Sequence, residues 1–202
     1  VYVLNAGGSG NISGFRLSSG GMLSPIAGAT QPLSGAAVGP AQAGFSPNGA
    51  TLVVTEKGTN TITLYDIDGA GLASAPRPQA SAGMTPFGFA FDTRGRLVVS
   101  EAFGGAVGAS AVSSYGANLT GGLLVRSASV GNGQAAACWV AITPNNRYAY
   151  VTNTASGNVS GYRLDTDGRL TLLDSGISGT TGAGPIDMSI TPDGLRLFTL
   201  DG

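Results

Sequence analysis

The sequence predicts an all-β protein built from repeated four-stranded antiparallel sheets, and three observations support this fold class. Strand-like segments recur along the 202 residues, with 51, 45, 52 and 48 residues between their last positions. A turn such as SPNG (46–49) or TPDG (191–194) comes before such segments, with Pro and Gly at the positions that a tight turn requires. The longest stretch without Gly or Pro, 145–156, is centred on YAYVT, whose aromatic and β-branched residues favour a strand over a helix.

Each repeat contains four predicted strands. An apolar run before the turn is the first strand, and the recurring segment after it is the second: YVLN (2–5), VVTE (53–56), VVSE (98–101), YVTN (150–153) and FTLD (198–201). The third ends in an aromatic residue, which predicts packing between neighbouring sheets: ISGF (12–15), ITLY (62–65), VSSY (112–115) and VSGY (159–162). The fourth is clearest in RLTLLD (169–174). Four short strands with a period near 50 residues are typical of one blade of a β-propeller.

The repeats divide the chain at about 1–38, 39–84, 85–136, 137–183 and 184–202, within one domain spanning 1–202. Because the chain begins and ends with a second strand, we expect about four blades that form a segment of a longer propeller. The alternative is a closed four-bladed ring, in which the last first-type strand completes the first blade. In a segment, the end blades expose unpaired strand edges, which predicts self-association.

Composition excludes several classes of function. Ten basic and eleven acidic residues give a net charge of −1, so no basic surface is expected to bind nucleic acid. The absence of histidine rules out histidine-based nucleophilic catalysis and histidine-bound zinc, and the single Cys138 rules out an intrachain disulfide. No apolar run reaches the length of a membrane span. Few lysines and many Ser, Thr, Gly and Asn residues favour a secreted bacterial protein, periplasmic or extracellular.

The segment TPNNRYAYVTNTASGNVSGYRLDTDGRL (143–170) resembles the YVTN-repeat β-propellers, and more particularly the lactonase family that includes 6-phosphogluconolactonase and carboxymuconate cyclase. The segments 39–65 and 183–201 have the same frame, so the resemblance spans essentially the whole chain. It implies that the chain is part of a seven-bladed propeller. It also implies hydrolysis of a sugar lactone or a related cyclic ester.

Two family positions can be compared with this chain. Members often carry His two residues after a Pro at the start of the first strand; the matching residues here are Gln42, Gly88, Trp139 and Asp187. Members also often end the second strand in Asn-Glu. Glu56 and Glu101 match that glutamate, but Thr55 and Ser100 replace the asparagine. The chain therefore keeps half of the family's polar residues at this end of the blade.

A candidate site follows from strand direction. Antiparallel strands bring the start of each first strand and the end of each second strand to the same face, around the central channel. We therefore expect Glu56 and Glu101 to serve as general base, activating water against a lactone carbonyl. The expected ligand-binding residues are Gln42, Trp139, Asn153, Asp187 and Asp201. The alternative is that the polar strand ends only bond backbone N–H groups of the following turn.

Two further alternatives remain open. Oxygen atoms of Glu56, Glu101, Asn153 and Asp201 are of the kind that calcium prefers, but no dense DxDxDG loop occurs, so we predict no metal or other cofactor.

The expected partner is a small-molecule lactone or carbohydrate. The second reading is a non-catalytic β-propeller module for binding or surface display, which the missing histidine favours.

Overall fold

A computed structural model describes residues 1–202 and confirms the all-β class, with eighteen strands and two single-turn 3₁₀ helices, η1 (Phe103–Gly105) and η2 (Asp174–Gly176). Neither helix is long or apolar enough to cross a membrane. The strands of the first two sheets are β1 (Tyr2–Asn5), β2 (Asn11–Leu17), β3 (Leu23–Pro32), β4 (Pro40–Phe45), β5 (Thr51–Glu56), β6 (Thr61–Asp66) and β7 (Arg77–Ala80). The third sheet contains β8 (Pro86–Phe91), β9 (Leu97–Glu101), β10 (Ala111–Tyr115) and β11 (Val125–Gly131). The remaining strands are β12 (Ala137–Ile142), β13 (Tyr148–Asn153), β14 (Asn158–Leu164), β15 (Leu170–Leu172), β16 (Gly179–Thr180), β17 (Pro185–Ile190) and β18 (Leu197–Asp201).

The strands pair in the order that the repeat predicts. Three antiparallel sheets run in chain order, β4-β5-β6-β7, β8-β9-β10-β11 and β12-β13-β14-β15, and β16 adds to the last of them through β14. The chain opens with the three-stranded sheet β1-β2-β3 and closes with the pair β17-β18. Each sheet is thus a meander whose neighbours in sequence are neighbours in space, because short turns connect antiparallel strands.

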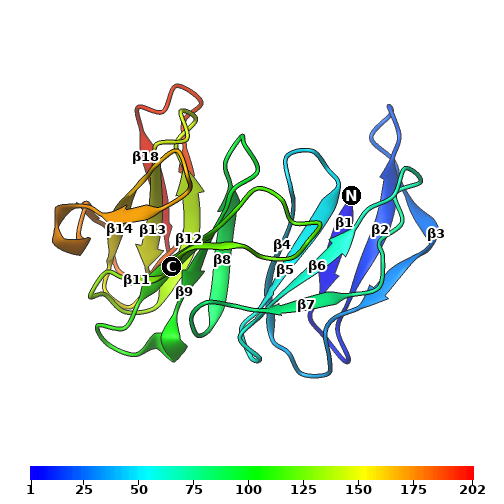
Figure 1. The fold of residues 1–202 in the computed structure, drawn as a ribbon, viewed down its shortest axis with the longest axis horizontal. Helices are drawn as coiled ribbons and strands as arrows, with labels where there is room; N and C mark the ends of the chain where they lie inside the picture. The colour runs from blue at the N-terminus through cyan, green and yellow to red at the C-terminus, as the bar shows by residue number, and fades with distance from the viewer.

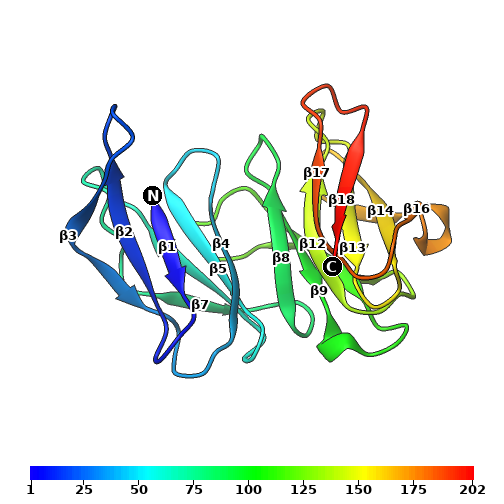
Figure 2. The ribbon, with the colours of Figure 1, turned by 180° about the vertical axis from the view of Figure 1, so that it is seen from behind.

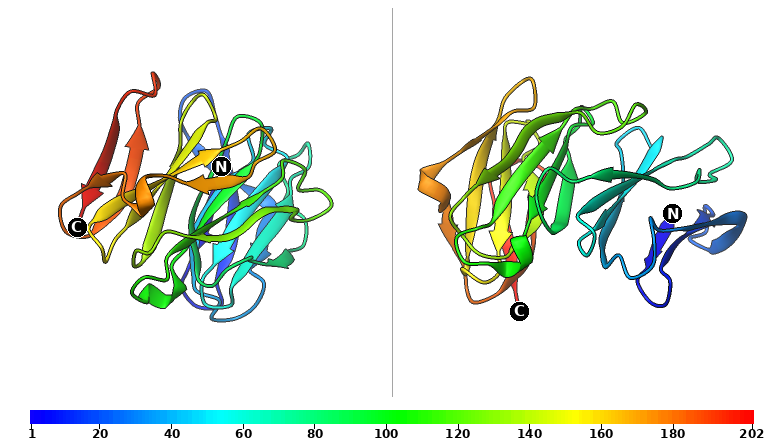
Figure 3. Two further views of the ribbon diagram at one scale, coloured as in Figure 1. Left: turned by 60° about the vertical axis from the view of Figure 1, so that its left-hand side comes forward. Right: turned by 60° about the horizontal axis from the view of Figure 1, so that its bottom comes forward.

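The sheets follow one another in an open arc. The first strands of successive sheets, β4, β8, β12 and β17, lie next to one another. Figures 1 and 2 show β1–β3 at one end of the long axis and the sheets containing β14 and β18 at the other, and Figure 3 shows the same arc from two further sides. The closed four-bladed ring would pair β17 with β1, whereas β17 pairs with β18 alone.

The apolar core lies between successive sheets. One cluster joins Ile12 and Leu33 to Leu52 and Val54, and the next joins residues such as Val53 and Ile62 to the third sheet. A third cluster joins Val98 and Val112 to the β12–β15 sheet. The β4–β7 and β8–β11 sheets therefore each bury one face against the sheet before and the other against the sheet after, which is the packing of radially repeated blades.

The aromatic residues at the ends of the third strands connect neighbouring sheets, as the repeat predicted. Tyr65, Tyr115 and Tyr162 are completely buried. The Tyr65 hydroxyl donates to the carbonyl of Pro32 at 2.8 Å, and the Tyr162 hydroxyl donates to that of Val130 at 3.0 Å. Burial raises the pKa of each of these phenols, so they stay neutral donors or acceptors.

The β17–β18 sheet leaves apolar side chains uncovered. Phe198 and Leu200 are 60% and 59% exposed, and Leu195 in the preceding turn is 77% exposed. Residues 198 and 200 share one face of β18, because side chains alternate along a strand. Self-association through this end of the arc stays a prediction.

Candidate functional site

All the predicted site residues lie at one rim of the sheets. Each second strand ends opposite the start of the first strand: Pro40 pairs with Glu56, Pro86 with Glu101, Ala137 with Asn153 and Pro185 with Asp201. The register then shifts in every first strand, directly after these pairs. The shifts include Gly88 and Trp139 and directly precede Gln42 and Asp187, the four positions where the resembling family often carries histidine. A bulge re-aims the side chains around it and leaves an amide without a ladder partner.

Hydroxyl groups compensate for these bulges. The Thr55 hydroxyl accepts a hydrogen bond from the Gln42 N–H (3.2 Å) and donates one to the Phe87 carbonyl in the next sheet (2.6 Å). The Ser100 hydroxyl accepts from the Gly88 N–H (3.0 Å) and contacts the Cys138 carbonyl of the following sheet at 2.5 Å. The residues that replace the family's asparagine therefore hold successive first strands together.

Glu101 lies in a closed polar environment. Its side chain is completely buried and accepts hydrogen bonds from the Ser113 hydroxyl (2.5 Å) and the Ser129 hydroxyl (2.6 Å). A Cβ atom added at Gly83, in the linker from the preceding sheet, would overlap the carboxylate. Burial raises the pKa of Glu101, and the hydrogen bonds from Ser113, Ser129 and the Gly83 backbone offset part of that increase.

The other polar strand ends make the same kind of contact. Glu56 is also completely buried, and it accepts hydrogen bonds from the backbone N–H (3.1 Å) and the hydroxyl of Ser34. Asn153 accepts from Asn132 at 3.1 Å, and the exposed Asp201 accepts from the Gly182 N–H at 2.9 Å. In each case the partner lies in the linker that leaves the preceding sheet. These side chains therefore tie each sheet to its neighbour.

Two of the bulge positions are closed to a ligand by backbone packing. The Gln42 side chain accepts from the Phe89 N–H at 2.7 Å and donates to the Phe89 carbonyl at 3.1 Å, so its amide is held by the backbone of β8. At Gly88, an added Cβ atom would overlap the Cys138 carbonyl oxygen and lie 2.9 Å from the Cα of Trp139. Only glycine allows β8 and β12 to approach this closely.

Accessible groups gather beside these closed positions. The rings of Phe87 and Trp139 meet edge to face with centroids 6.3 Å apart, and both are partly exposed. The Lys57 ammonium lies 4.9 Å from the centroid of the Phe87 ring. Asp187 is exposed on β17. The rim therefore presents an aromatic surface with a cation on it and a carboxylate on a neighbouring strand.

The charges of Lys57 and Asp187 both affect the pKa of the Cys138 thiol. Burial raises its pKa, the Thr154 hydroxyl and Lys57 lower it, and the carboxylate of Asp187 raises it further. Cys138 is half-buried, with its sulfur 3.7 Å from the Ile186 carbonyl. The thiol stays protonated near neutral pH, because the largest effect favours the neutral form.

Sequence reasoning missed Lys57 and Phe87. Lys57 is the single lysine of the chain and directly follows Glu56, and Phe87 follows the Pro86 that opens β8. Their positions could have been predicted, because residues next to Glu56 and Pro86 in the sequence lie at the same rim as the candidate site. Their contact across two sheets could not be read from either segment alone.

The potential calcium ligands do not form a cluster. Glu56, Glu101, Asn153 and Asp201 belong to four different sheets. Glu56, Asn153 and Asp201 each bond to a separate linker, whereas Glu101 bonds to Ser113 and Ser129 of its own sheet. No group of three or more Asp, Glu, Cys or His side chains is placed to hold a metal ion.

A pocket of ≈ 340 Å³ lies away from the rim, between the β12–β16 sheet and β18, where Tyr150, Val159 and Leu197 line it.

The arrangement of sheets and the packing between them place the chain among proteins with a β-propeller-like fold. One similar structure is a provisionally named 6-phosphogluconolactonase from Bacteroides uniformis, with a TM-score of 0.77 and 16% identity over 99% of this chain and 60% of that one. The periplasmic gluconolactonase of Pseudomonas aeruginosa aligns with a TM-score of 0.72 and 15% identity, over 98% and 59% of the two chains. Virginiamycin B lyase from Staphylococcus aureus aligns with a TM-score of 0.62 and 14% identity, over 99% and 62%.

The chain spans about three fifths of the length of these neighbours. At such low identities, the similarity shows a shared fold. No protein-family model matches the sequence. No curated protein sequence matches it either.

Proposed function

We propose that this rim binds a sugar lactone or a related cyclic ester and hydrolyses it. The observation that carries the proposal is the partly exposed Phe87–Trp139 pair, with Lys57 over one ring and Asp187 on the next first strand. Lactonase names among proteins of the same fold support the substrate class. A periplasmic or extracellular location belongs to the same proposal, and one of those neighbours is a periplasmic enzyme.

The accessible groups suit the parts of such a substrate. An aromatic face packs against the C–H face of a sugar ring, as aromatic side chains do with other apolar surfaces. The Lys57 ammonium can donate to the lactone carbonyl and stabilise the negative charge that develops there when water adds. The carboxylate of Asp187 can accept hydrogen bonds from sugar hydroxyls and hold the ring in position.

Hydrolysis also needs a base. Water adds to the carbonyl carbon and gives a proton to a carboxylate, the ring C–O bond breaks, and the departing oxygen takes a proton to leave a hydroxy acid. The role of general base predicted for Glu56 and Glu101 requires the linkers at Ser34 and Gly83 to open, because both carboxylates are buried. Asp187 is an exposed carboxylate on a first strand at the rim and provides the alternative base.

The experiment is alkali uptake at constant pH with glucono-1,5-lactone and its 6-phosphate. We expect hydrolysis above the buffer rate, about 10²-fold slower in Lys57→Met and about tenfold slower in Trp139→Ala. Arg16→Met, which removes an exposed cation from β2, is the matched control and should be unchanged. Glu56→Gln, Glu101→Gln and Asp187→Asn, each checked for folding, identify the base.

A rate equal to that of buffer would overturn the hydrolytic proposal. If the lactone then still quenched the Trp139 fluorescence at saturable concentrations, the rim would be a binding site without catalysis. If neither turnover nor binding were seen, or if Lys57→Met and Arg16→Met behaved alike in both measurements, the proposed site would be wrong.

A further inference from the structure

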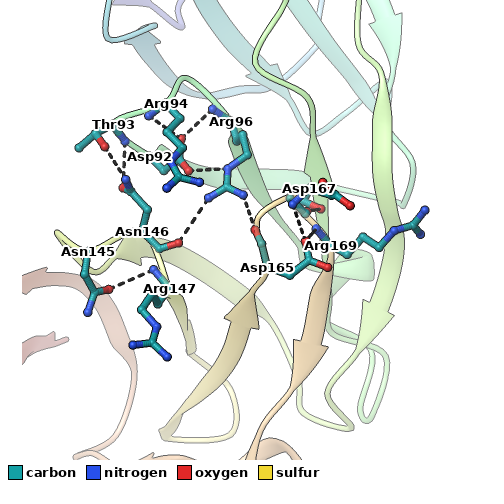
Figure 4. Close-up of polar contacts among 12 residues, drawn as sticks. Asp92, Thr93, Arg94, Arg96, Asn145, Asn146, Arg147, Asp165, Asp167 and Arg169 are labelled. Atoms are coloured by element: carbon teal, nitrogen blue, oxygen red, sulfur yellow. Dashed lines mark hydrogen bonds and ion pairs between the residues drawn. The ribbon is translucent and has the colours of Figure 1, made fainter.

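A second polar site lies at the opposite rim, where turns connect the first and second strands. The turn between β8 and β9, the turn between β12 and β13, and the end of β14 surround a pocket of ≈ 270 Å³. Its lining includes Arg94, Arg96, Asn146, Arg147, Arg163 and Asp165. Figure 4 shows the two turns meeting around the Arg96 guanidinium, with Asp165 beside it and Arg147 following Asn146 in the second turn.

Arg96 holds this pocket together. Its Nε donates to Asp92 Oδ2 at 2.6 Å, and the two side chains are only 6% and 0% exposed. The rest of the guanidinium donates to the backbone carbonyls of Asn146 (3.3 Å) and Asp165, both in the next sheet. The Asn146 side chain in turn accepts from the Thr93 N–H at 3.0 Å. The pocket walls are therefore fixed before any ligand arrives.

Three other arginines of the pocket have no carboxylate partner. Arg94, Arg147 and Arg163 are exposed, and the ion pairs of the chain are those of Arg77, Arg96 and Arg196 with their aspartates. Four of the ten basic residues thus line one pocket of a chain whose net charge is −1. This concentration of positive charge favours the binding of an anion.

The two aspartates of the site neutralise only part of this charge. Asp92 is matched by Arg96, and its Oδ1 accepts the backbone N–H groups of Arg94 and Arg96 at 3.0 and 2.8 Å. The Asp165 carboxylate accepts the N–H groups of Asp167 and Arg169 at 2.9 and 2.8 Å, and these bonds, led by that from Arg169, lower its pKa. Four arginines against two aspartates leave a charge of +2.

We propose that this pocket binds a dianionic phosphate group. A phosphate carries close to two negative charges at neutral pH and offers several acceptor oxygens. Guanidinium groups donate to such oxygens in pairs, and here they come from three separate segments of two sheets. The volume accommodates more than the phosphate alone, so the group can belong to free phosphate or to a small phosphate ester such as a sugar phosphate. The site is separate from the lactone site, because it lies at the other end of β8 and β12.

The test is isothermal titration calorimetry of the whole chain with inorganic phosphate, glucose 6-phosphate and glucose, at constant ionic strength set with sodium chloride. We expect saturable binding of phosphate and no binding of glucose. Tighter binding of glucose 6-phosphate than of phosphate would identify an ester as the occupant, and equal binding would identify the free ion. Arg147→Ala and Arg163→Ala should each weaken binding about tenfold or more, whereas Arg16→Ala should leave it unchanged.

Absence of saturable phosphate binding by the unaltered chain would overturn the proposal. Equal affinities in Arg147→Ala and Arg16→Ala would overturn it as well, because binding would then reflect general attraction of anions. Both arginines tested are exposed, so their loss should leave the fold intact, and circular dichroism verifies this. Lactone turnover is measured separately, so either proposal can fail while the other stands.

Discussion

The Gly83 backbone passes so close to the Glu101 carboxylate that a single added methyl group would overlap the carboxylate oxygen. Gly83 lies in the linker between β7 and β8, which belong to successive sheets, and Glu101 is the last residue of β9. The contact between the buried Glu101 carboxylate and the Gly83 backbone therefore limits how closely the two sheets can pack.

Replacing Gly83 with alanine should destabilise the protein. The new methyl group would displace the Glu101 carboxylate from the Ser113 and Ser129 hydroxyls, and we expect a loss of about 1–3 kcal/mol in the free energy of unfolding. Urea denaturation measures it. Gly121→Ala is the control, since an added Cβ atom there has nothing within 4 Å. Equal stabilities of the two variants would show that the contact carries no strain.

The stability of the protein should fall as the pH rises through the raised pKa of Glu101. The folded state holds the proton of this carboxyl more tightly than the unfolded chain, so stabilisation is complete below the ordinary pKa of 4.5 and is lost above it. The loss amounts to roughly 1.4 kcal/mol for each pH unit between the two pKa values. Urea midpoints at a series of pH values, compared with those of Glu101→Gln, isolate this contribution.

Ser129→Ala extends that experiment. It removes one hydrogen bond that lowers the pKa of Glu101, so the fall in stability should continue to higher pH than in the unaltered chain. A pH profile that is the same in the unaltered chain and in Glu101→Gln would contradict the buried, perturbed carboxyl that the structure describes.

Placing a histidine at position 88, as the resembling family often has, should destabilise the protein without increasing any hydrolysis. Its Cβ atom would overlap the Cys138 carbonyl, and the neighbouring strands would have to move apart, at a cost of about 3 kcal/mol. Thermal unfolding and alkali uptake on Gly88→His check both parts. The matched control is Gly131→Ala at the end of β11, where an added Cβ atom has open space. A stable Gly88→His variant with increased lactone turnover would show that the first strands can separate.

The uncovered face of β18 should drive association between copies of the chain. Phe198→Ser removes an apolar side chain that is 60% exposed and should lower the apparent mass in light scattering at high protein concentration. Val107→Ser, at a position 93% exposed in the loop between β9 and β10, is the control for loss of exposed apolar surface elsewhere. A monomer at all concentrations would contradict the predicted self-association.

The strand pattern was accessible to sequence reasoning because its signals are local. A turn such as TPDG and the alternation of residues along VVTE report on their own few residues, and β5 and β13 contain the predicted second strands. Strand direction also brings Glu56 and Asn153 to the same rim, since an antiparallel meander leaves no other choice.

The contacts that those side chains make could not be predicted from the sequence. The partner of Glu56 is Ser34, which is 22 residues earlier in the linker between β3 and β4, and nothing in the sequence around either residue indicates the pairing. Whether a polar strand end faces a channel or a linker depends on how tightly the sheets pack. That packing depends in turn on side chains such as Tyr65 and on the glycine at position 88.

The amino-acid sequence by itself determined the class of fold, the four-stranded unit and the rim to which each polar residue belongs, because hydrogen bonding and turn geometry act over short distances along the chain. The tertiary structure alone decided which of those groups meet a solvent-borne ligand: it buried Glu56 and Glu101, left Lys57, Phe87 and Trp139 accessible, and brought arginines of two repeats around one pocket. The reason is that burial and electrostatic complementarity arise between sheets, from contacts whose partners are distant in sequence.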